Sequence, residues 1–287
     1  MTGIAPENEE AISAWDGPLF DRFVEYRHIV VGGLTPHGEK ALELYPPAPG
    51  DRVVDIGCGF GDTAQKIAGL VGPEGSVLGV DAAPRFIEAA TAEAREAGVA
   101  NALFAVADVE AAPLEGPFDF AFSRFGTMFF ANPVNALRNV RSAMVPDARL
   151  CMVVWRRKTE NEWMYRAQVI TERFVTKPDE YDEPTCGPGP FAMGDADTTS
   201  HILLNAGFRD ITFTRCDLPI LSGRDLDEAV EFAMQLGPAA EILRLQGDRA
   251  AHLHDDVRAA LAEGFADLVA DEGVLAPSSS WIVSALA

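Results

Sequence analysis

The chain has 287 residues, a length that α/β proteins often build around one sheet, so we expect a single elaborated domain. Its 44 acidic and 23 basic side chains leave a net charge of −21, which would repel a phosphate backbone and argues against DNA or RNA as a partner. The scattered Cys58, Cys151, Cys186 and Cys216 predict neither a disulfide framework nor a metal site, and with no leader-like or membrane-spanning apolar run we expect a cytoplasmic protein.

The first 50 residues are expected to form an N-terminal helical cap. Aromatic and apolar side chains alternate with charged ones from Trp15 to Tyr26, a pattern typical of packed helices. Three prolines and a glycine within residues 45–50 then indicate a linker. We therefore place the main domain at residues 51–287.

From residue 51 onward, short apolar strands alternate with helices. Asp62 and Gln65 predict a capping box at the start of the first of these helices, and Pro84 and Gly98 suit the start and end of the second. This alternation predicts an α/β fold whose mostly parallel sheet is covered by helices on both faces. The seven strands are expected at Val53–Ile56, Val77–Val80, Leu103–Val106, Phe118–Phe122, Leu150–Trp155, Ile211–Cys216 and Trp281–Ala285.

Two stretches interrupt the alternation. Residues of about 156–196 combine prolines with aromatic side chains and predict an irregular lid over a sheet edge. Residues of about 222–275, between the last two strands, predict a second insertion that is helical. The prolines of the first insertion are Pro178, Pro184, Pro188 and Pro190.

A glycine-rich loop follows the first strand, with Gly57, Gly59 and Gly61 in alternate positions. Glycines let a backbone turn sharply and approach a ligand, and they leave the N–H groups of the next helix free. A dinucleotide-binding loop has the spacing G-x-G-x-x-G, whereas here Asp62 stands where the third glycine would be. Asp55, just before the loop, would oppose a pyrophosphate but attract an ammonium. The loop therefore favours a ligand with an amino-acid-like head group.

Two further acids end the second and third strands. Asp81 could accept hydrogen bonds from both hydroxyls of a ribose, and Asp108 from the exocyclic amine of an adenine, although a plain turn cap is an alternative role for Asp108. The carboxyl ends of parallel strands meet at the ligand-binding edge of a sheet. Three acids at three successive strand ends therefore indicate a bound nucleoside.

These stretches resemble the class I S-adenosylmethionine-dependent methyltransferases, in the group that includes the ubiquinone and menaquinone biosynthesis methyltransferases. The resemblance covers about residues 50–215 and implies a Rossmann-like fold with helical lid insertions. It also implies S-adenosylmethionine as the cofactor and methyl transfer to a small-molecule acceptor. The matching segments beyond the glycine loop are Gly79-Val80-Asp81, Ala107-Asp108-Val109, Phe118 to Phe125, the helix from Asn132-Pro133 to Met144, the strand to Trp155, and Asn205-Ala206-Gly207-Phe208.

The same resemblance implies which residues contact the cofactor. Gly57, Gly59 and Gly61 would line its methionine part, with Asp55 at the amino group. The ribose would lie at Asp81. The residues expected around the adenine and at the end of the fourth strand are Ala82, Asp108, Val109 and the Ser123 backbone. Phe60 and Arg124 are further candidates, for which core packing and a surface ion pair are equal alternatives.

Methyl transfer from a sulfonium depends mainly on proximity and orientation, so a general base is optional. If the acceptor needs one, the candidates are His28, His37 and His201, with Tyr26 as an orienting group. A structural or surface role is the simpler interpretation of each. His252 and His254 lie two apart on a predicted helix and point in different directions, so we expect no metal site.

The acceptor is expected to be apolar or aromatic if the flanks fold over the sheet. Phe129 and Phe130 follow the fourth strand, and Trp15, Trp155, Trp163 and Phe191 would join them. The sequence sets neither the methylated atom nor the oligomeric state. Two alternatives stay open: an NAD(P)-dependent oxidoreductase, which the glycine spacing opposes, and a non-catalytic S-adenosylmethionine-binding protein, which the cofactor motifs alone do not separate from an enzyme.

Overall fold

The computed structural model describes residues 4–175 and 188–287, so Pro178, Pro184 and Cys186 lie outside the described residues. Its centre is one sheet of eight strands in the order β3-β2-β1-β4-β5-β8-β6, with β7 paired to β8. The strands are β1 (Arg52–Ile56), β2 (Ser76–Asp81), β3 (Ala102–Val106), β4 (Phe118–Arg124), β5 (Met144–Trp155), β6 (Arg209–Gly223), β7 (Val269–Ala270) and β8 (Gly273–Leu286).

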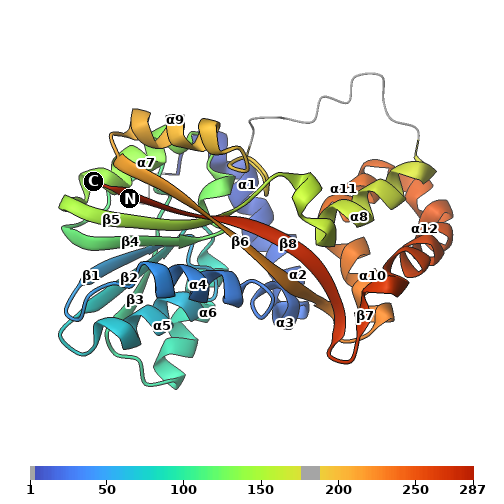
Figure 1. Ribbon diagram of the computed structural model, residues 1–287, viewed down its shortest axis with the longest axis horizontal. Coiled ribbons are helices and arrows are strands. Elements are labelled where there is room, and N and C mark those ends of the chain that lie inside the picture. Colours follow the sequence, from blue (N-terminus) through green and yellow to red (C-terminus); the bar gives the residue numbers. More distant parts are fainter. Residues whose placement is uncertain (1–3, 176–187) are drawn as a thin grey trace.

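Helices cover both faces of this sheet, as the sequence predicted. Figure 1 shows α4 and α5 along one face and α7 and α9 along the other. This arrangement follows from right-handed crossovers, which put the helices after β1 and β2 on one side and those after β4 and β5 on the other. The first helices in chain order are α1 (Glu9–Ala14), α2 (Phe20–Glu25), α3 (Arg27–Val30), α4 (Thr35–Leu44), α5 (Asp62–Val71), α6 (Pro84–Glu96) and α7 (Pro133–Ser142).

Strands β1 to β5 pair in parallel, and β8 enters antiparallel between β5 and β6. The prediction of a mostly parallel Rossmann-like sheet is therefore confirmed. The predicted count of seven strands is one too low, because the two-residue strand β7 adds to β8 through two residue pairs. The last two long strands also exceed their predicted lengths, since β6 and β8 continue as a two-stranded ribbon beyond Trp155, where β5 ends.

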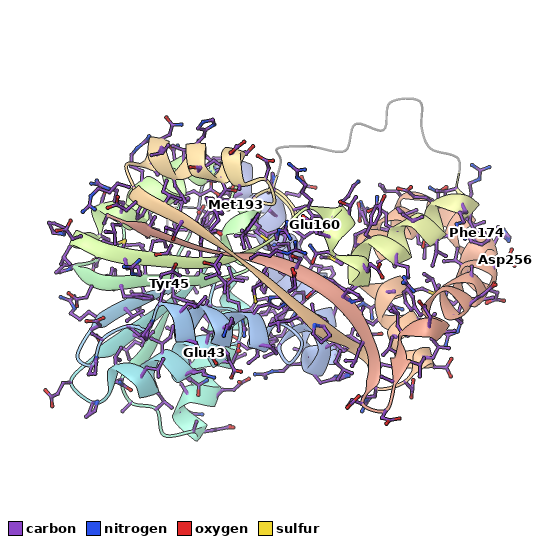
Figure 2. All side chains as sticks on the ribbon, viewed as in Figure 1. Glu43, Tyr45, Glu160, Phe174, Met193 and Asp256 are labelled. Atoms are coloured by element: carbon purple, nitrogen blue, oxygen red, sulfur yellow. The ribbon has the colours of Figure 1, made fainter. Side chains whose placement is uncertain are left out.

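This ribbon carries a second layer of helices, which we call the helical lobe: α8 (Glu162–Thr171), α10 (Leu226–Gln235), α11 (Pro238–Leu245) and α12 (Ala250–Phe265). The lobe has its own apolar core, in which Ile170 packs with Val230, Val257 and Leu261. Figure 2 shows Phe174 and Asp256 on the side of the lobe that faces away from the sheet.

Two local predictions were wrong. The stretch 156–196 is not irregular throughout, because residues Glu162–Thr171 form α8; α9 (Ala196–Ala206) then returns to the sheet. The capping box at Asp62 does not form, since Gly61 in a left-handed conformation is the N-cap and the Asp62 side chain instead binds Arg124. An ion pair to another element has replaced the local cap.

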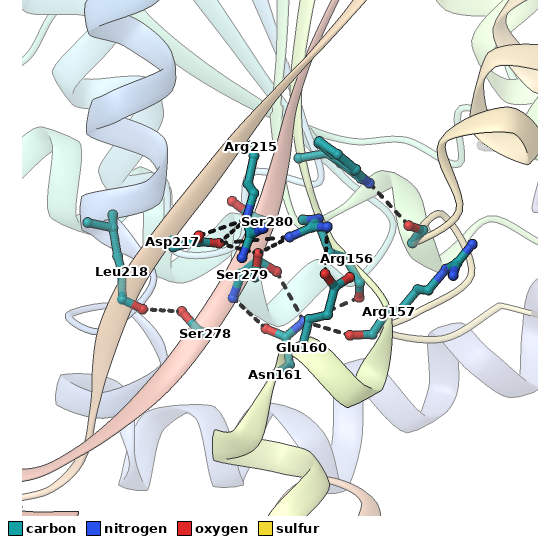
Figure 3. Close-up of polar contacts among 12 residues, drawn as sticks. Arg156, Arg157, Glu160, Asn161, Arg215, Asp217, Leu218, Ser278, Ser279 and Ser280 are labelled. Atoms are coloured by element: carbon teal, nitrogen blue, oxygen red, sulfur yellow. Dashed lines mark hydrogen bonds and ion pairs between the residues drawn. The ribbon is translucent and has the colours of Figure 1, made fainter.

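A polar junction fixes the lobe to the sheet (Figure 3). Asn161, fully buried, donates to the carbonyl oxygen of Ser279 at 3.0 Å and accepts from its N–H at 2.9 Å. Arg156 donates to the Ser279 hydroxyl at 2.9 Å and pairs with Glu160 at 2.5 Å. Its guanidinium also lies 4.4 Å from the centre of the Trp281 ring. These contacts set the position of α8, and with it one wall of the site.

Within residues 4–175 and 188–287, no helix has both the length and the apolar character needed to cross a membrane.

Candidate functional site

A cavity of about 400 Å³ lies at the carboxyl ends of β1, β2 and β4. The N-terminal helices contribute Trp15 and Phe23, the sheet edge contributes the glycine loop, and the lobe contributes Trp163 and Phe232. Such a position is the usual ligand site of open α/β sheets. The walls divide into a polar end along the glycine loop and an apolar end under the lobe.

The three loop glycines have different roles. All have positive φ, at 67°, 54° and 74° for Gly57, Gly59 and Gly61. Gly57 and Gly59 line the cavity with backbone, whereas Gly61 is not in its wall. Gly61 instead makes room for the Phe104 ring, from which a Cβ at this position would lie only 2.6 Å away. The third glycine therefore lets α5 pack closely against the sheet.

Asp55 lies under the loop and is almost completely buried. Its Oδ2 atom has no hydrogen-bond partner in the part of the chain that the structure describes. Burial raises the pKa of Asp55 to about 7, and the charge of Arg124 offsets part of that rise. Asp55 itself is not in the cavity wall, so the predicted contact of this carboxylate with a ligand ammonium stays a prediction.

Asp81 holds the loop and the next helix together. Its Oδ2 accepts from the N–H of Gly59 and its Oδ1 from the N–H of Ala83, both at 3.0 Å. Burial raises the pKa of Asp81, while these backbone donors lower it. The carboxylate and its neighbour Ala82 both line the cavity.

Asp108 also lines the cavity, and it is already occupied by the N-terminal segment. Its Oδ2 accepts from the N–H of Ala5 and from the side-chain amide of Asn8, both at 3.0 Å, and its Oδ1 accepts from the N–H of Glu110 at 2.9 Å. The predicted neighbour Val109 lies beside it in the wall. The amide of Asn8 thus stands where the sequence predicts an adenine amine.

The remaining predicted contacts have mixed positions. Phe60 and Arg124 line the cavity, and Arg124 forms a two-pronged pair with Asp62 at 2.8 and 3.0 Å. Ser123 is fully buried behind the wall, where its hydroxyl donates to the carbonyl oxygen of Ile56 at 2.8 Å. A surface ion pair was one alternative predicted for Arg124. The pair that forms is mostly buried, with 12% of the Arg124 side chain and 26% of the Asp62 side chain exposed.

The apolar end is built from aromatic side chains of β5, α8, α10 and the residue after β4. Trp155 at the end of β5 stacks on Phe125 with ring centres 4.0 Å apart, and Trp163 lies 5.3 Å from Trp155. Phe232 of α10 stacks on Trp163 at 6.5 Å and 7°. Of the predicted aromatic residues, Trp15, Phe129 and Phe130 line the cavity with Trp155 and Trp163, whereas Phe191 is not in its wall.

The three predicted base candidates and the orienting group Tyr26 all lie outside the cavity wall. His37 is fully buried between the hydroxyls of Ser280 and Ser278, at 2.8 and 2.9 Å, and burial lowers its pKa to about 4. His28 pairs with Glu228 at 3.1 Å. Tyr26 packs against Phe232, which helps to raise its pKa through burial, and His201 is exposed on α9. None is placed to take a proton from a bound acceptor.

Sequence reasoning missed Asn8, Phe86, Phe232 and Leu236, all of which line the cavity. Phe232 lies in α10 of the second insertion and Leu236 caps that helix, and from the sequence their spacing of four indicated only a packed helix face. Asn8 had no local signal at all.

Comparison with known proteins decides the family. Residues 47–188 match a sequence family described as a methyltransferase domain. The chain contains a class I S-adenosylmethionine-dependent methyltransferase domain. The predictions of this family and of S-adenosylmethionine as the cofactor are confirmed. The buried Asp55, whose Oδ2 has no partner among the described residues, and the glycine backbones in the cavity wall are consistent with that cofactor.

Relatives of this methyltransferase domain act on small molecules. Over 113 residues it is 36% identical to the aklanonic acid methyltransferase DauC of Streptomyces sp. strain C5, covering 39% of this chain and 51% of DauC. It is 33% identical to the nocamycin O-methyltransferase of Saccharothrix syringae, covering 46% and 48% of the two chains. The matches thus span about half the length of these relatives. The ubiquinone/menaquinone C-methyltransferase UbiE of Ectopseudomonas mendocina is 26% identical over 64% of this chain and 76% of its own.

Solved structures share the fold. The YcgJ protein of Bacillus subtilis superposes with a TM-score of 0.56 at 17% identity, covering 89% of this chain and 97% of its own. A methyltransferase of Bacillus halodurans gives 0.55 at 14% identity, covering 87% and 97%. At these identities the likeness concerns the fold alone.

Proposed function

We propose that this chain transfers the methyl group of S-adenosylmethionine to a small apolar acceptor that contains a ring. The observation that carries the proposal is the apolar end of the cavity, where Phe125 stacks on Trp155 and Trp163 on Phe232, with Met164 in the same wall. Flat aromatic walls favour a flat ligand through area burial and offset stacking. The names of the relatives, which include an aklanonic acid methyltransferase and a ubiquinone/menaquinone biosynthesis C-methyltransferase, support a small-molecule acceptor.

Orientation is the main contribution of the protein to this reaction. When bound, the cofactor supplies a methyl group already activated by a positive sulfur. The glycine loop and Asp55 would hold its amino-acid end, and Asp81 and Asp108 its nucleoside. The aromatic walls would then fix the acceptor in line with the methyl group, and such alignment can lower a barrier by about 7 to 11 kcal/mol relative to free reactants.

We propose that no protein base takes the acceptor proton. Among the described residues that line the cavity there is no histidine, lysine or tyrosine, and the four acids all lie at the cofactor end. A suitable acceptor therefore carries an acidic hydroxyl or an activated carbon that loses its proton to water. The carbon–sulfur bond breaks as the new bond to the acceptor forms.

The test combines binding with transfer. S-adenosylhomocysteine at about 100 times its Kd should stabilise the chain by about 2.7 kcal/mol, and NAD and NADP should not. Tritiated S-adenosylmethionine should then label hydroxylated naphthoquinones or anthraquinones, and Asp81→Asn should abolish both effects while the exposed Asp271→Asn keeps them. Stabilisation by NAD alone would indicate an oxidoreductase. Binding without label in any acceptor would indicate a non-catalytic binding protein.

A further inference from the structure

A second cavity of about 610 Å³ lies beside the first, between the N-terminal helices and the helical lobe. Pro18 and Arg22 form one side, and Ala240, Arg244 and His254 of α11 and α12 form the other. None of the predicted cofactor residues contributes to it. The proposed methyl transfer described above therefore leaves this cavity unassigned.

The two cavities share part of their walls: Leu19, Leu236 and Gly237 line both. Gly237 joins α10 to α11 with φ 98° and ψ −167°, a backbone conformation that favours glycine. A Cβ at this position would have no atom within 4 Å apart from those of its chain neighbours, so there is open space beside Gly237. The other two residues of this shared wall, Leu19 and Leu236, have half-buried side chains.

The cavities differ in charge. Among the described side chains, four acids and one arginine line the first cavity, whereas two arginines, Arg22 and Arg244, and one acid, Glu241, line the second. The chain as a whole has a net charge of −21, so the second cavity departs from its general acidity. The first cavity thus suits a cation, and the second presents two guanidinium groups to an anion.

The two arginines can bind a ligand at little cost. Arg22 pairs with Glu25 at 2.8 Å and Arg244 with Glu241 at 2.7 Å, both three residues apart along a helix. Exposed ion pairs of this kind contribute little to the free energy of unfolding. A carboxylate brought into the cavity could therefore recruit either guanidinium, in the two-pronged geometry that arginine favours.

We infer that the second cavity binds the far end of the acceptor, and that the acceptor is an elongated molecule with an apolar ring at one end and a carboxylate at the other. The ring lies against Trp155 and Trp163, the molecule passes Gly237, and the carboxylate meets Arg22 and Arg244. This inference rests on the proposed function, because it assigns the first cavity to the ring that is methylated.

A matched pair of probes tests the inference. Pyrenebutyrate and pyrenebutanol have the same ring and nearly the same length, and only the first ends in a carboxylate. With the protein saturated by S-adenosylhomocysteine, fluorescence titration should show pyrenebutyrate binding about tenfold more tightly. The double variant Arg22→Gln/Arg244→Gln should remove that difference and leave the affinity for pyrenebutanol unchanged. Arg209→Gln, at an exposed arginine of β6, is the control and should keep it.

Filling the second cavity provides an independent variant. Ala240→Trp should weaken pyrenebutyrate at least tenfold while S-adenosylhomocysteine binds normally, which also shows that the variant is folded. Equal affinities for the two probes, or no effect of Ala240→Trp on either, would overturn the inference. The titrations are repeated without S-adenosylhomocysteine, so that failure of the chain to bind that ligand rejects the proposed function separately.

Discussion

At the scale of single residues, Asp55 combines burial, a free oxygen and a pKa of about 7. In the ligand-free protein the raised pKa means that the folded state holds a proton the unfolded state has lost. The stabilisation that comes from this retained proton is therefore fully present below about pH 4, and it is lost as the pH rises through about 7 and the folded state loses the proton too. A cation bound beside Asp55 would reverse that loss, because it favours the carboxylate.

Asp55 should make cofactor binding depend on pH. The carboxylate fraction rises through a pKa of about 7, so the affinity for S-adenosylhomocysteine should increase about tenfold between pH 6 and 8. Asp55→Asn should bind more weakly at pH 8 and show a flat profile by calorimetry. Asp271→Asn, at an exposed turn, should keep the slope. A slope that persists in Asp55→Asn would assign the titration to another group.

Gly61 should be essential for packing rather than for ligand contact. In Gly61→Ala, a Cβ would lie 2.6 Å from the Phe104 ring and 2.9 Å from the Ala90 Cβ, in a left-handed conformation. We expect a loss of about 2 to 4 kcal/mol in the free energy of unfolding, measured by urea titration. Gly98→Ala has a similar φ of 71° but open space, and should lose only about 1 to 2 kcal/mol. Equal losses would mean that the backbone conformation alone is responsible.

The sequence revealed the cofactor end of the site more fully than the acceptor end, for a physical reason. Glycines and acids at strand ends form a local pattern, because one turn brings them together. The apolar wall joins Trp155, Trp163 and Phe232 from separate elements, and only tertiary packing makes them neighbours. The base candidates were misleading because isolated histidines carry no positional information.

At the scale of elements, the N-terminal segment closes the nucleoside end by binding Asp108. Its aromatic side chains also pack on residues that follow the strands. The ring centres of Trp15 and Phe129 are 5.0 Å apart, and those of Phe20 and Phe86 are 4.9 Å apart. We retain the division at residue 50 as a proposal, since this segment is part of the cavity wall. Strand positions followed from apolar runs, but the ends of β6 and β8 did not, because their ribbon continues through polar residues such as Ser278 and Ser279.

Releasing Asp108 should strengthen cofactor binding. Asn8→Ala removes one of the two donors on Oδ2 and leaves that oxygen available to an adenine amine. We expect the affinity for S-adenosylhomocysteine to rise by roughly threefold and the free energy of unfolding to fall by about 1 kcal/mol, as for loss of one hydrogen bond. Asn135→Ala, exposed on α7, should change neither. A weaker affinity would show that Asn8 holds the ligand instead of competing with it.

At the scale of the whole molecule, the net charge of −21 opposes the compact state. Its exposed ion pairs, such as Arg224 with Glu228, each contribute little, so screening of the overall repulsion should dominate. Raising NaCl from about 0.02 to 0.5 M, which shortens the Debye length several-fold, should raise Tm by a few degrees. KCl should give the same rise, and a fall in Tm with both salts would mean that the ion pairs outweigh the repulsion.

The ribbon of β6 and β8 also bears on how the chain folds. Residues between Gly223 and Val274, which pair at the ribbon's far end, form most of the lobe, so the lobe occupies the place of a hairpin turn. Closing so long a loop without structure would be slow, whereas an already collapsed lobe brings the two strands close together. We therefore expect the lobe to form first and β8 to join β5 last, because Arg149 and Leu286 are far apart in sequence. Mutations in the lobe core should then slow refolding of the sheet.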